Sequence, residues 1–391
     1  MTRAGALTIR IITDVQGWET LRPWWDALLE ASTDSTPWQN WDYLSCWWRN
    51  LGGDKDLRII VVESARVPVM IFPLQITREI MIGIPTRIIE PISMMWDVNR
   101  PRFAIGAPDM NAFRLGLEAL WGLRKEWDSI RVEELPIEDP QAQELRALAE
   151  RRGLWFRDVL SSMCPYLHLD QSWDAFLKSR GSRLRKNLRA SLRRLESEGP
   201  VRLEVAESPE DVVRAFDVAM DLHRRSWKRK KQVGLSLSVQ YREFFRAFLL
   251  NMAARERACV LTLWAADRPV AATIAFQHLD TYFSTEIVHD AAFARCSPGT
   301  LLESFELERL MSRGAKRFQY YDFLGRFLSN KQRWTDLARA THRIYVFRPS
   351  PANWLLDLHY FRAKPAVKRL WRGVFGLSRV TAQAMRFMPR T

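Results

Sequence analysis

The spacing of apolar residues alternates along the chain between the two-residue period of strands and the 3.6-residue period of helices. In the first half the pattern predicts strands at 7–12, 57–63, 67–77 and 129–133, and helices at 18–31, 38–49, 109–125 and 140–153. A polar turn at 64–66 joins two of these strands into a hairpin. The run 83–108 is rich in Gly, Pro and isolated apolar residues, so short strands and loops are expected there. Residues 154–169 look extended, and Pro165 should weaken a continuous strand.

A second cycle of the same pattern begins at Ser172. It predicts strands at 201–206, 258–265, 270–278, 281–289, 318–322 and 342–348, and helices at 172–178, 182–198, 208–230, 238–255, 300–313 and 330–337. Both halves therefore run strand, helices, hairpin strands, helix, strand. This order predicts an α/β chain with mixed sheets, built from two similar units at 1–170 and 171–350 and followed by a tail at 351–391.

Length and composition agree with this division, because 391 residues exceed one average core. A hydrophobic content of 47% and a charged content of 27% are typical of a soluble globular protein. Many of the 17 tryptophans fall early, at helical spacing. We interpret them as helix-packing residues in preference to an aromatic ligand platform.

The net charge of +14 points to an anionic partner: nucleic acid, a phosphorylated cofactor or anionic lipid. No nucleic-acid-binding motif is visible, so DNA is not expected. The four cysteines are far apart without ligand spacing, which predicts neither a metal site nor disulfides and fits the cytoplasm. The sequence shows no signal peptide and no apolar run of 18 residues, so we expect a cytoplasmic protein, at most peripheral to the inner face of a membrane.

The turn from Cys296 to Leu301 joins a strand to a helix. The amides of a helix's first turn lack intrahelical partners, and together with the helix dipole they favour an anion such as a pyrophosphate. We therefore expect Ser297, Gly299, Thr300 and Leu301 to hold a phosphate-bearing cofactor.

Four segments make the second half resemble the GNAT acyltransferase superfamily, in its tandem-domain branch with Fem-type aminoacyltransferases and acetyltransferase-like proteins of cellulose and exopolysaccharide synthesis. These are the basic helix from Arg183 to Leu195, the stretch His223–Trp227, the turn Ser297–Gly299, and Tyr321–Gly325 followed by Lys331–Trp334. In the first half, Trp38 to Trp47 and the hairpin ending Phe72-Pro73-Leu74 add to the likeness. The match covers most of residues 7–348.

The resemblance implies two tandem GNAT-like domains with a basic amphipathic helical tail, and acyl-coenzyme A as donor without a metal. One departure weakens the coenzyme A assignment. The usual turn is Gln/Arg-x-x-Gly-x-Gly/Ala, whereas Arg295 to Thr300 has one glycine, and Pro298 removes an amide donor. The donor of the Fem group is an aminoacyl-tRNA, which is less favoured here and stays open. A non-catalytic GNAT-like module that binds an acidic glycan is a further alternative.

The reaction implied is direct attack of an amine or hydroxyl on an acyl carbonyl held between the strands 281–289 and 318–322. Glu286 is a candidate general base because a carboxylate in a mostly apolar strand is costly to bury; the alternative is a solvent-facing strand residue. Strict alternation would put Ser284, Glu286 and Val288 on one face. Asp322 ends the next strand and is a second catalytic candidate, against a turn-capping role. Tyr321 could protonate the leaving group, although core packing is the favoured interpretation for either Tyr320 or Tyr321 taken singly.

The remaining candidates are basic or aromatic. Lys331 matches a family lysine and is expected to pair with the donor's phosphate or a substrate carboxylate, against a solvated helix face. The expected substrate-binding residues are His223, Trp227, Arg185, Arg189 and Trp334. For His223 the favoured alternative is a structural histidine bonded to a carboxylate or a carbonyl. The two arginines lie on a basic helix that is equally explained as an ordinary amphipathic helix.

The tail interleaves aromatic and basic residues, with Asp357 as its one acid. Such a segment is typical of a surface anchor on an anionic membrane, or it packs on the protein's own domains. The expected acceptor is a small molecule, a glycan or an envelope precursor.

Overall fold

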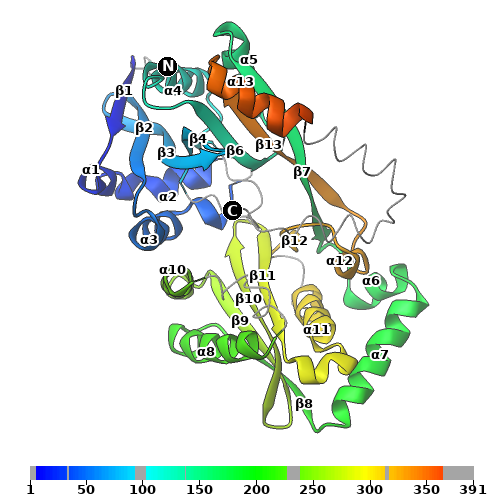
Figure 1. Cartoon of the computed structure of the whole chain (residues 1–391). Coiled ribbons are helices and arrows are strands. Elements are labelled where there is room, and N and C mark those ends of the chain that lie inside the picture. Colours follow the sequence, from blue (N-terminus) through cyan, green and yellow to red (C-terminus); the bar gives the residue numbers. More distant parts are fainter. Residues whose placement is uncertain are drawn as a thin grey trace.

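The computed structural model describes residues 6–32, 35–92, 103–136, 138–226, 238–312 and 317–363, and it forms two lobes linked by long strands (Figure 1). The first lobe contains β1 (Leu7–Ile12), α1 (Val15–Glu19), α2 (Arg22–Ala31), η1 (Pro37–Gln39), α3 (Trp41–Leu51), β2 (Asp56–Ser64), β3 (Val67–Met81), β4 (Ile84–Pro91), β5 (Ile105–Gly106), α4 (Met110–Gly122), β6 (Ser129–Leu135), α5 (Pro140–Arg151) and β7 (Trp155–His168). The second contains α6 (Trp173–Ser179), α7 (Ser182–Glu196), β8 (Val201–Ala206), α8 (Pro209–Arg225), α10 (Val239–Ala253), β9 (Ala258–Ala265), β10 (Arg268–His278), β11 (Thr281–His289), η3 (Ala291–Cys296), α11 (Pro298–Ser312), β12 (Tyr320–Asp322) and α12 (Ser329–Gln332). The chain then returns to the first lobe as β13 (Ala338–Phe347), α13 (Pro351–Asp357) and η4 (Leu358–Ala363).

The strands form one continuous mixed sheet, which confirms the predicted fold class. Its order is β1-β2-β3-β4-β6-β13-β7-β12-β11-β10-β9-β8, with β5 paired to β3. Each lobe has one parallel pair, β4 with β6 and β11 with β12, and a helix connects its two strands. The predicted boundaries at 170 and 350 stay a prediction, but β13 lies between β6 and β7 of the first lobe.

Helix starts follow the capping residues in the sequence. The side chains of Asp109, Ser172, Ser208 and Ser238 each accept a hydrogen bond from a first-turn amide of α4, α6, α8 and α10. The helix predicted over 18–31 is instead two helices, α1 and α2. Pro23 lies in the first turn of α2 and cannot donate to the carbonyl four residues earlier, so the helix breaks before it.

Pro165, which was expected to weaken a continuous strand, does not end it: β7 runs through this residue from Trp155 to His168. Up to and including Pro165 the strand pairs with β13, and after it the strand pairs with β12. The carbonyl oxygen of Pro165 accepts from the Phe323 amide at 3.1 Å. A proline is tolerated because β7 changes partner at this residue.

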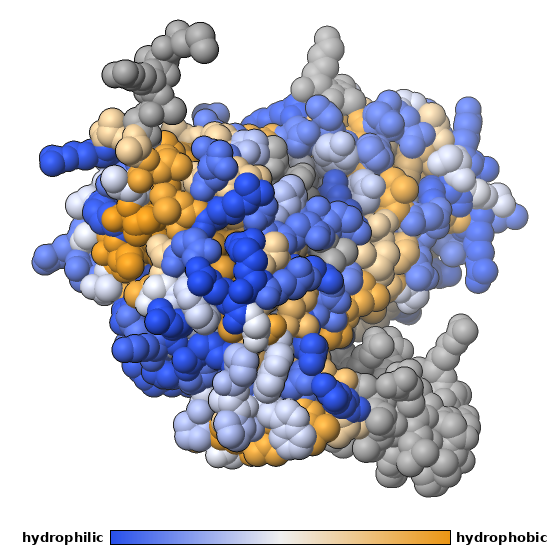
Figure 2. Space-filling view, turned by 90° about the horizontal axis from the view of Figure 1, so that it is seen from above, coloured by the Kyte–Doolittle hydropathy of each residue, from blue (hydrophilic) through white to orange (hydrophobic). Residues whose placement is uncertain are grey.

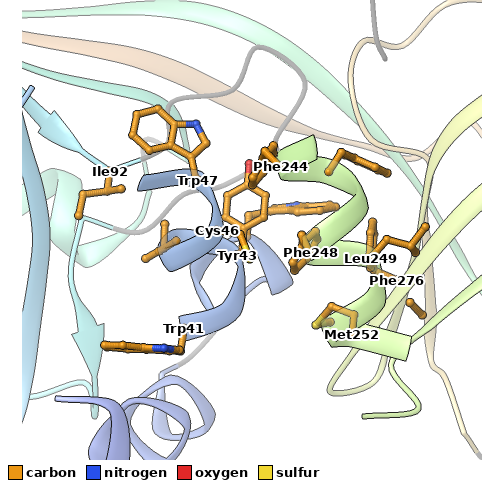
Figure 3. Close-up of a cluster of buried hydrophobic side chains, with 14 of the residues drawn as sticks. Trp41, Tyr43, Cys46, Trp47, Ile92, Phe244, Phe248, Leu249, Met252 and Phe276 are labelled. Carbon is orange, nitrogen blue, oxygen red and sulfur yellow. The ribbon is translucent and has the colours of Figure 1, made fainter. Parts of the chain in front are cut away.

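Most of the early tryptophans pack in the core, as predicted: Trp18, Trp25, Trp38, Trp41 and Trp47 are buried, whereas Trp48 is half-buried and Trp24 is exposed. The buried ones belong to a hydrophobic cluster that crosses the two lobes, where α3 faces α10 (Figure 3). The Tyr43 ring centroid lies 4.9 Å from that of Phe248 and 5.2 Å from that of Phe244. The lobes therefore share one core at this interface.

The beginning of the tail packs on the first lobe. Arg157 of β7 pairs with Asp357 at 2.6 Å, and the Phe361 ring lies 5.4 Å from the Tyr345 ring of β13. Residues 364–391, most of the predicted amphipathic tail, lie outside the described residues.

Across the described residues, no helix is long and apolar enough to cross a membrane. The face seen from above shows hydrophobic patches among hydrophilic residues (Figure 2). The four cysteine thiols are buried and unpaired by disulfides. Burial raises the pKa of Cys164 to about 11 and that of Cys259 to about 12, so both are protonated at neutral pH.

Candidate active site

The parallel strands β11 and β12 pair over three residues and then part. Thr281, Tyr282 and Phe283 face Tyr320, Tyr321 and Asp322 in register. β12 ends at Asp322, while β11 continues to His289 with β10 as its neighbour. Beyond Phe283, this edge of β11 pairs with no strand of the described residues, at the place where the acyl carbonyl was expected. This unpaired stretch of β11 is called the opening below.

A β-bulge at this point changes which side chains face the opening. Ile274 of β10 is opposite Glu286 and Ala275 is opposite Ser284, so Thr285 is the extra residue, and its hydroxyl donates to the Ile274 carbonyl at 2.7 Å. The prediction that Ser284, Glu286 and Val288 share one face is wrong for this reason.

The contacts of neighbouring residues locate the two faces. Ser284 points to α11, since its hydroxyl lies 3.3 Å from a Glu306 carboxylate oxygen. Val288 instead packs against Ala219 and Leu222 of α8. Glu286, two residues before Val288, lies on that α8 side and is half-buried.

Asp322 lies on the same side of the sheet as Glu286. Its register partner Phe283 belongs to the core beneath α8 and α10, with its ring centroid 6.2 Å from that of Trp38. Asp322 is 2% exposed; its Oδ1 accepts from the Leu324 amide at 2.8 Å, and its Oδ2 lies 3.7 Å from Nη1 of Arg339. The structure thus brings the two candidate carboxylates to one face, and it also gives Asp322 the capping contact of the alternative reading.

The third catalytic candidate, Tyr321, lies on the opposite face. Its side chain is fully buried against α11, and its hydroxyl donates to Glu306 at 2.5 Å. Burial raises the pKa of Tyr321 well above its usual value of 10. The opposite orientations of Tyr321 and Asp322 follow from strand alternation. The acid role for Tyr321 stays a prediction.

The turn before α11 leads directly into the first turn of the helix, as expected, but some of the first-turn amides already donate hydrogen bonds within the protein. Ser297 adopts a left-handed conformation (φ 50°), and its carbonyl accepts from the amides of Thr300 at 3.0 Å and Leu301 at 3.1 Å. A Cβ at Gly299 would lie 3.5 Å from His289 and Ile287, so the turn packs directly on the end of β11. The Leu301 side chain is in the core, and its amide is the one that already donates to the Ser297 carbonyl, so binding a ligand through this amide would require that bond to break.

Arg333, which follows α12, adds a cation here. Its guanidinium donates to the Thr300 hydroxyl at 2.7 Å. A helix N-terminus beside an arginine is an arrangement that suits a phosphate. Arg333 was part of the sequence motif but was not among the predicted site residues.

Two other residues of this segment have partners within the protein. The Lys331 ammonium donates to the carbonyls of Phe323, at 2.9 Å, and of Leu324. These hydrogen bonds connect α12 to the turn after β12. Trp334 is fully buried and donates to Glu303 at 2.5 Å. It supports the site from within the core, so direct contact with a substrate, as predicted, would require this tryptophan to move.

Sequence reasoning missed two buried carboxylates of α11, Glu303 and Glu306. Burial raises the pKa of both, and that of Glu303 to about 7. The sequence did carry a signal for them. The two glutamates lie three residues apart in a helix whose buried face is otherwise mostly leucine, and acids on such a face need partners.

The remaining predicted residues flank the site. The Arg185 guanidinium donates to the Leu177 carbonyl at 3.3 Å, and Arg189 is exposed on α7. His223 is buried in α8. Trp227 lies outside the described residues.

The corresponding helix of the first lobe has a different N-terminus. The Asp109 carboxylate accepts from the amides of Asn111 at 2.8 Å and Ala112 at 3.2 Å. A fixed negative charge thus occupies the position that an anion would take. The second lobe is the better candidate for a donor site.

Known proteins share the fold of this chain. Residues 182–332 match the family model described as Acetyltransferase (GNAT) domain. The solved structure of FemX aligns with a TM-score of 0.57 and 11% identity, over 90% of this chain and 99% of that one. A conserved protein of unknown function from Bacteroides thetaiotaomicron VPI-5482 aligns with a TM-score of 0.53 and 10% identity, over 87% and 100% of the two chains. L-PGS from Bacillus licheniformis aligns with a TM-score of 0.51 and 14% identity, over 86% and 96%.

No curated protein sequence matches. The chain therefore shares its fold with these structures, and its second lobe contains the segment that matches a GNAT domain.

Proposed function

We propose that this chain, with its tandem GNAT-like fold, transfers an acyl group from acyl-coenzyme A to an amine or hydroxyl. The acceptor would be a small molecule, a glycan or an envelope precursor. The observation that carries the proposal is the opening where β11 continues past the end of β12, inside the segment that matches the GNAT domain.

In this proposal the donor and acceptor approach from different sides. The first turn of α11 and the Arg333 guanidinium would hold the donor's phosphates, so that its thioester reaches the open edge of β11. The acceptor would lie on the α8 side, where Glu286 or Asp322 can take the proton from the attacking group. No covalent enzyme intermediate is required.

Calorimetry with acetyl-, long-chain acyl- and free coenzyme A tests the donor. We expect binding by the native protein, and a Kd at least ~10-fold weaker for Arg333→Gln, because one charge-assisted phosphate contact is lost. Arg343→Gln is the matched control: this arginine pairs with Glu133 at 2.9 Å, on a strand of the first lobe. Flat thermograms with all three ligands would contradict the coenzyme A proposal.

An aminoacyl-tRNA donor, as in Fem-type enzymes, is the second candidate. It is favoured by Arg183, Lys186, Arg189 and Arg193, which are exposed along α7 with no carboxylate of the described residues in ion-pair distance. It predicts tRNA binding that weakens steeply with salt and in the variant R183Q/R189Q/R193Q. Binding that is insensitive to salt would exclude the aminoacyl-tRNA donor. If the protein binds only an acidic glycan, it is instead a non-catalytic module.

We also propose that the tail places the protein at an anionic membrane surface. Trp354 and Leu355 are 49% and 45% exposed just before the basic residues of 364–391. Co-sedimentation with phosphatidylglycerol vesicles but not phosphatidylcholine vesicles is expected. Sedimentation with neither vesicle type, or to the same extent with both, would contradict this proposal.

A further inference from the structure

The Glu306 side chain is bonded to both of the strands that form the opening. Its carboxylate accepts from the hydroxyl of Tyr282, on β11, at 2.9 Å and from that of Tyr321, on β12, at 2.5 Å. Tyr282 and Tyr321 are directly opposite each other in the parallel register. Their rings are stacked, with centroids 5.7 Å apart.

A third bond marks where the strands part. The hydroxyl of Ser284, the first residue of β11 on this face beyond the paired segment, lies 3.3 Å from the same carboxylate. The Thr273 hydroxyl of β10 lies 3.1 Å from that of Ser284 and extends the network to a third strand. Ser284 is also the last residue before the extra residue of the bulge.

The network is completely inside the protein. Glu306, Tyr282, Tyr321 and Thr273 are all 0% exposed. A carboxylate in such a position is costly unless it is bonded, and here each bond comes from a strand that borders the opening. β12 pairs with β7 on its other side and with β11 over only three residues, so the Glu306 carboxylate adds a side-chain link between β12 and β11 where their backbone pairing ends.

We propose that Glu306 is a positioning residue that fixes how far β11 and β12 separate, and thus the width of the opening that admits the donor's acyl group. The donor part of this statement rests on the proposed function. The mechanical part, that one carboxylate holds β12 against β11 at the start of the bulge, does not. Glu306 need not touch a substrate.

Hydrogen–deuterium exchange of the full chain tests the mechanical part without any substrate. In Glu306→Gln, the amide can accept at one oxygen only, so at least one tyrosine hydroxyl loses its acceptor. We expect amides in 318–324 and 284–289 to exchange at least ~10-fold faster, while those of β9 keep their native rates. Tyr321→Phe, which removes only the β12 bond, should speed exchange in 318–324.

The matched control is Glu90→Gln, which alters a buried carboxylate of the first lobe. Glu90 is 2% exposed and accepts from Thr77 at 2.8 Å and from Arg131 at 2.6 Å. This variant should leave exchange in 318–324 unchanged. If Glu306→Gln does not fold, Tyr321→Phe decides.

Two results would overturn the proposal: native exchange rates at 318–324 in Tyr321→Phe, or a rise spread evenly over β8 to β12, which is what a purely structural core group would give. With a coenzyme A ligand that binds the native protein, Glu306→Gln should also weaken binding at least ~10-fold and Glu90→Gln should not. If the native protein binds no such ligand, the proposed function fails while the exchange result still decides the role of Glu306.

Discussion

The two carboxylate oxygens of Asp322 have different surroundings. Oδ1 caps the turn after β12, and Oδ2 is directed toward Arg339 at 3.7 Å. The capping role and the catalytic role that the sequence left as alternatives are therefore compatible, because each uses a different atom.

Asp322→Asn separates the two roles. The amide oxygen can still accept from the Leu324 amide, so the free energy of unfolding should fall by no more than ~1.5 kcal/mol. A carboxamide cannot take a proton, and turnover should fall at least ~100-fold. Steady-state rates together with denaturant unfolding give both values, and native-like turnover would remove Asp322 from the catalytic site.

The Glu303 carboxyl should make stability depend on pH. Burial raises its pKa from 4.5 to about 7 in the folded protein. The folded state therefore binds the proton more tightly than the unfolded state, so this contribution is fully present below pH 4.5 and is lost as pH rises through about 7. Its size is on the order of 3 kcal/mol by the usual conversion.

Glu303→Gln is uncharged at every pH and should lose this dependence. We expect the difference in unfolding free energy between native protein and variant to change between pH 5 and pH 8, with the native protein losing more stability as pH rises. A constant difference across this range would show that Glu303 does not titrate there.

At the scale of elements, α3 and α10 join the lobes through aromatic side chains (Figure 3). Phe248 of α10 is fully buried, and its ring centroid lies 4.6 Å from that of Phe276 and 4.9 Å from that of Tyr43. The sequence predicted the two helices, at 38–49 and 238–255, but not that they meet.

Phe248→Ala should lower the free energy of unfolding by ~3–5 kcal/mol, because it leaves a cavity in a core that both lobes share. Trp24→Ala on α2, where the side chain is 42% exposed, should change it by less than ~0.5 kcal/mol. Denaturant unfolding of both variants measures this. Equal losses would contradict the assignment of the shared core.

At the scale of the whole molecule, β13 ties the end of the described chain to its first lobe. It pairs with β6 on one side and with β7 on the other, although about two hundred residues separate it from them in the sequence. The ion pair between Arg157 and Asp357 joins residues that are equally far apart. The first lobe is therefore completed by a strand that follows the second lobe in the sequence.

A chain shortened to end at residue 337 should therefore fail to fold as a soluble monomer. The loss of β13 leaves β6 and β7 with unpaired edges, and such edges promote aggregation. Size-exclusion chromatography of the shortened protein, beside one that ends at 363, provides the measurement. A soluble, cooperatively folded protein ending at 337 would show that β13 is dispensable.

Local patterns determined most of the elements, because strands, caps and amphipathic helices depend on residues that are neighbours in sequence. Thus Ser208 and Asp109 marked helix starts, and the strand 281–289 agrees with β11. The structure alone decided which faces and partners these elements have. The bulge at Thr285 shifts Glu286 relative to Ser284, β13 inserts into the first lobe, and Tyr282 and Tyr321 meet at Glu306. Such contacts join residues far apart in the chain, and their free energy is gained only when the strands pack together.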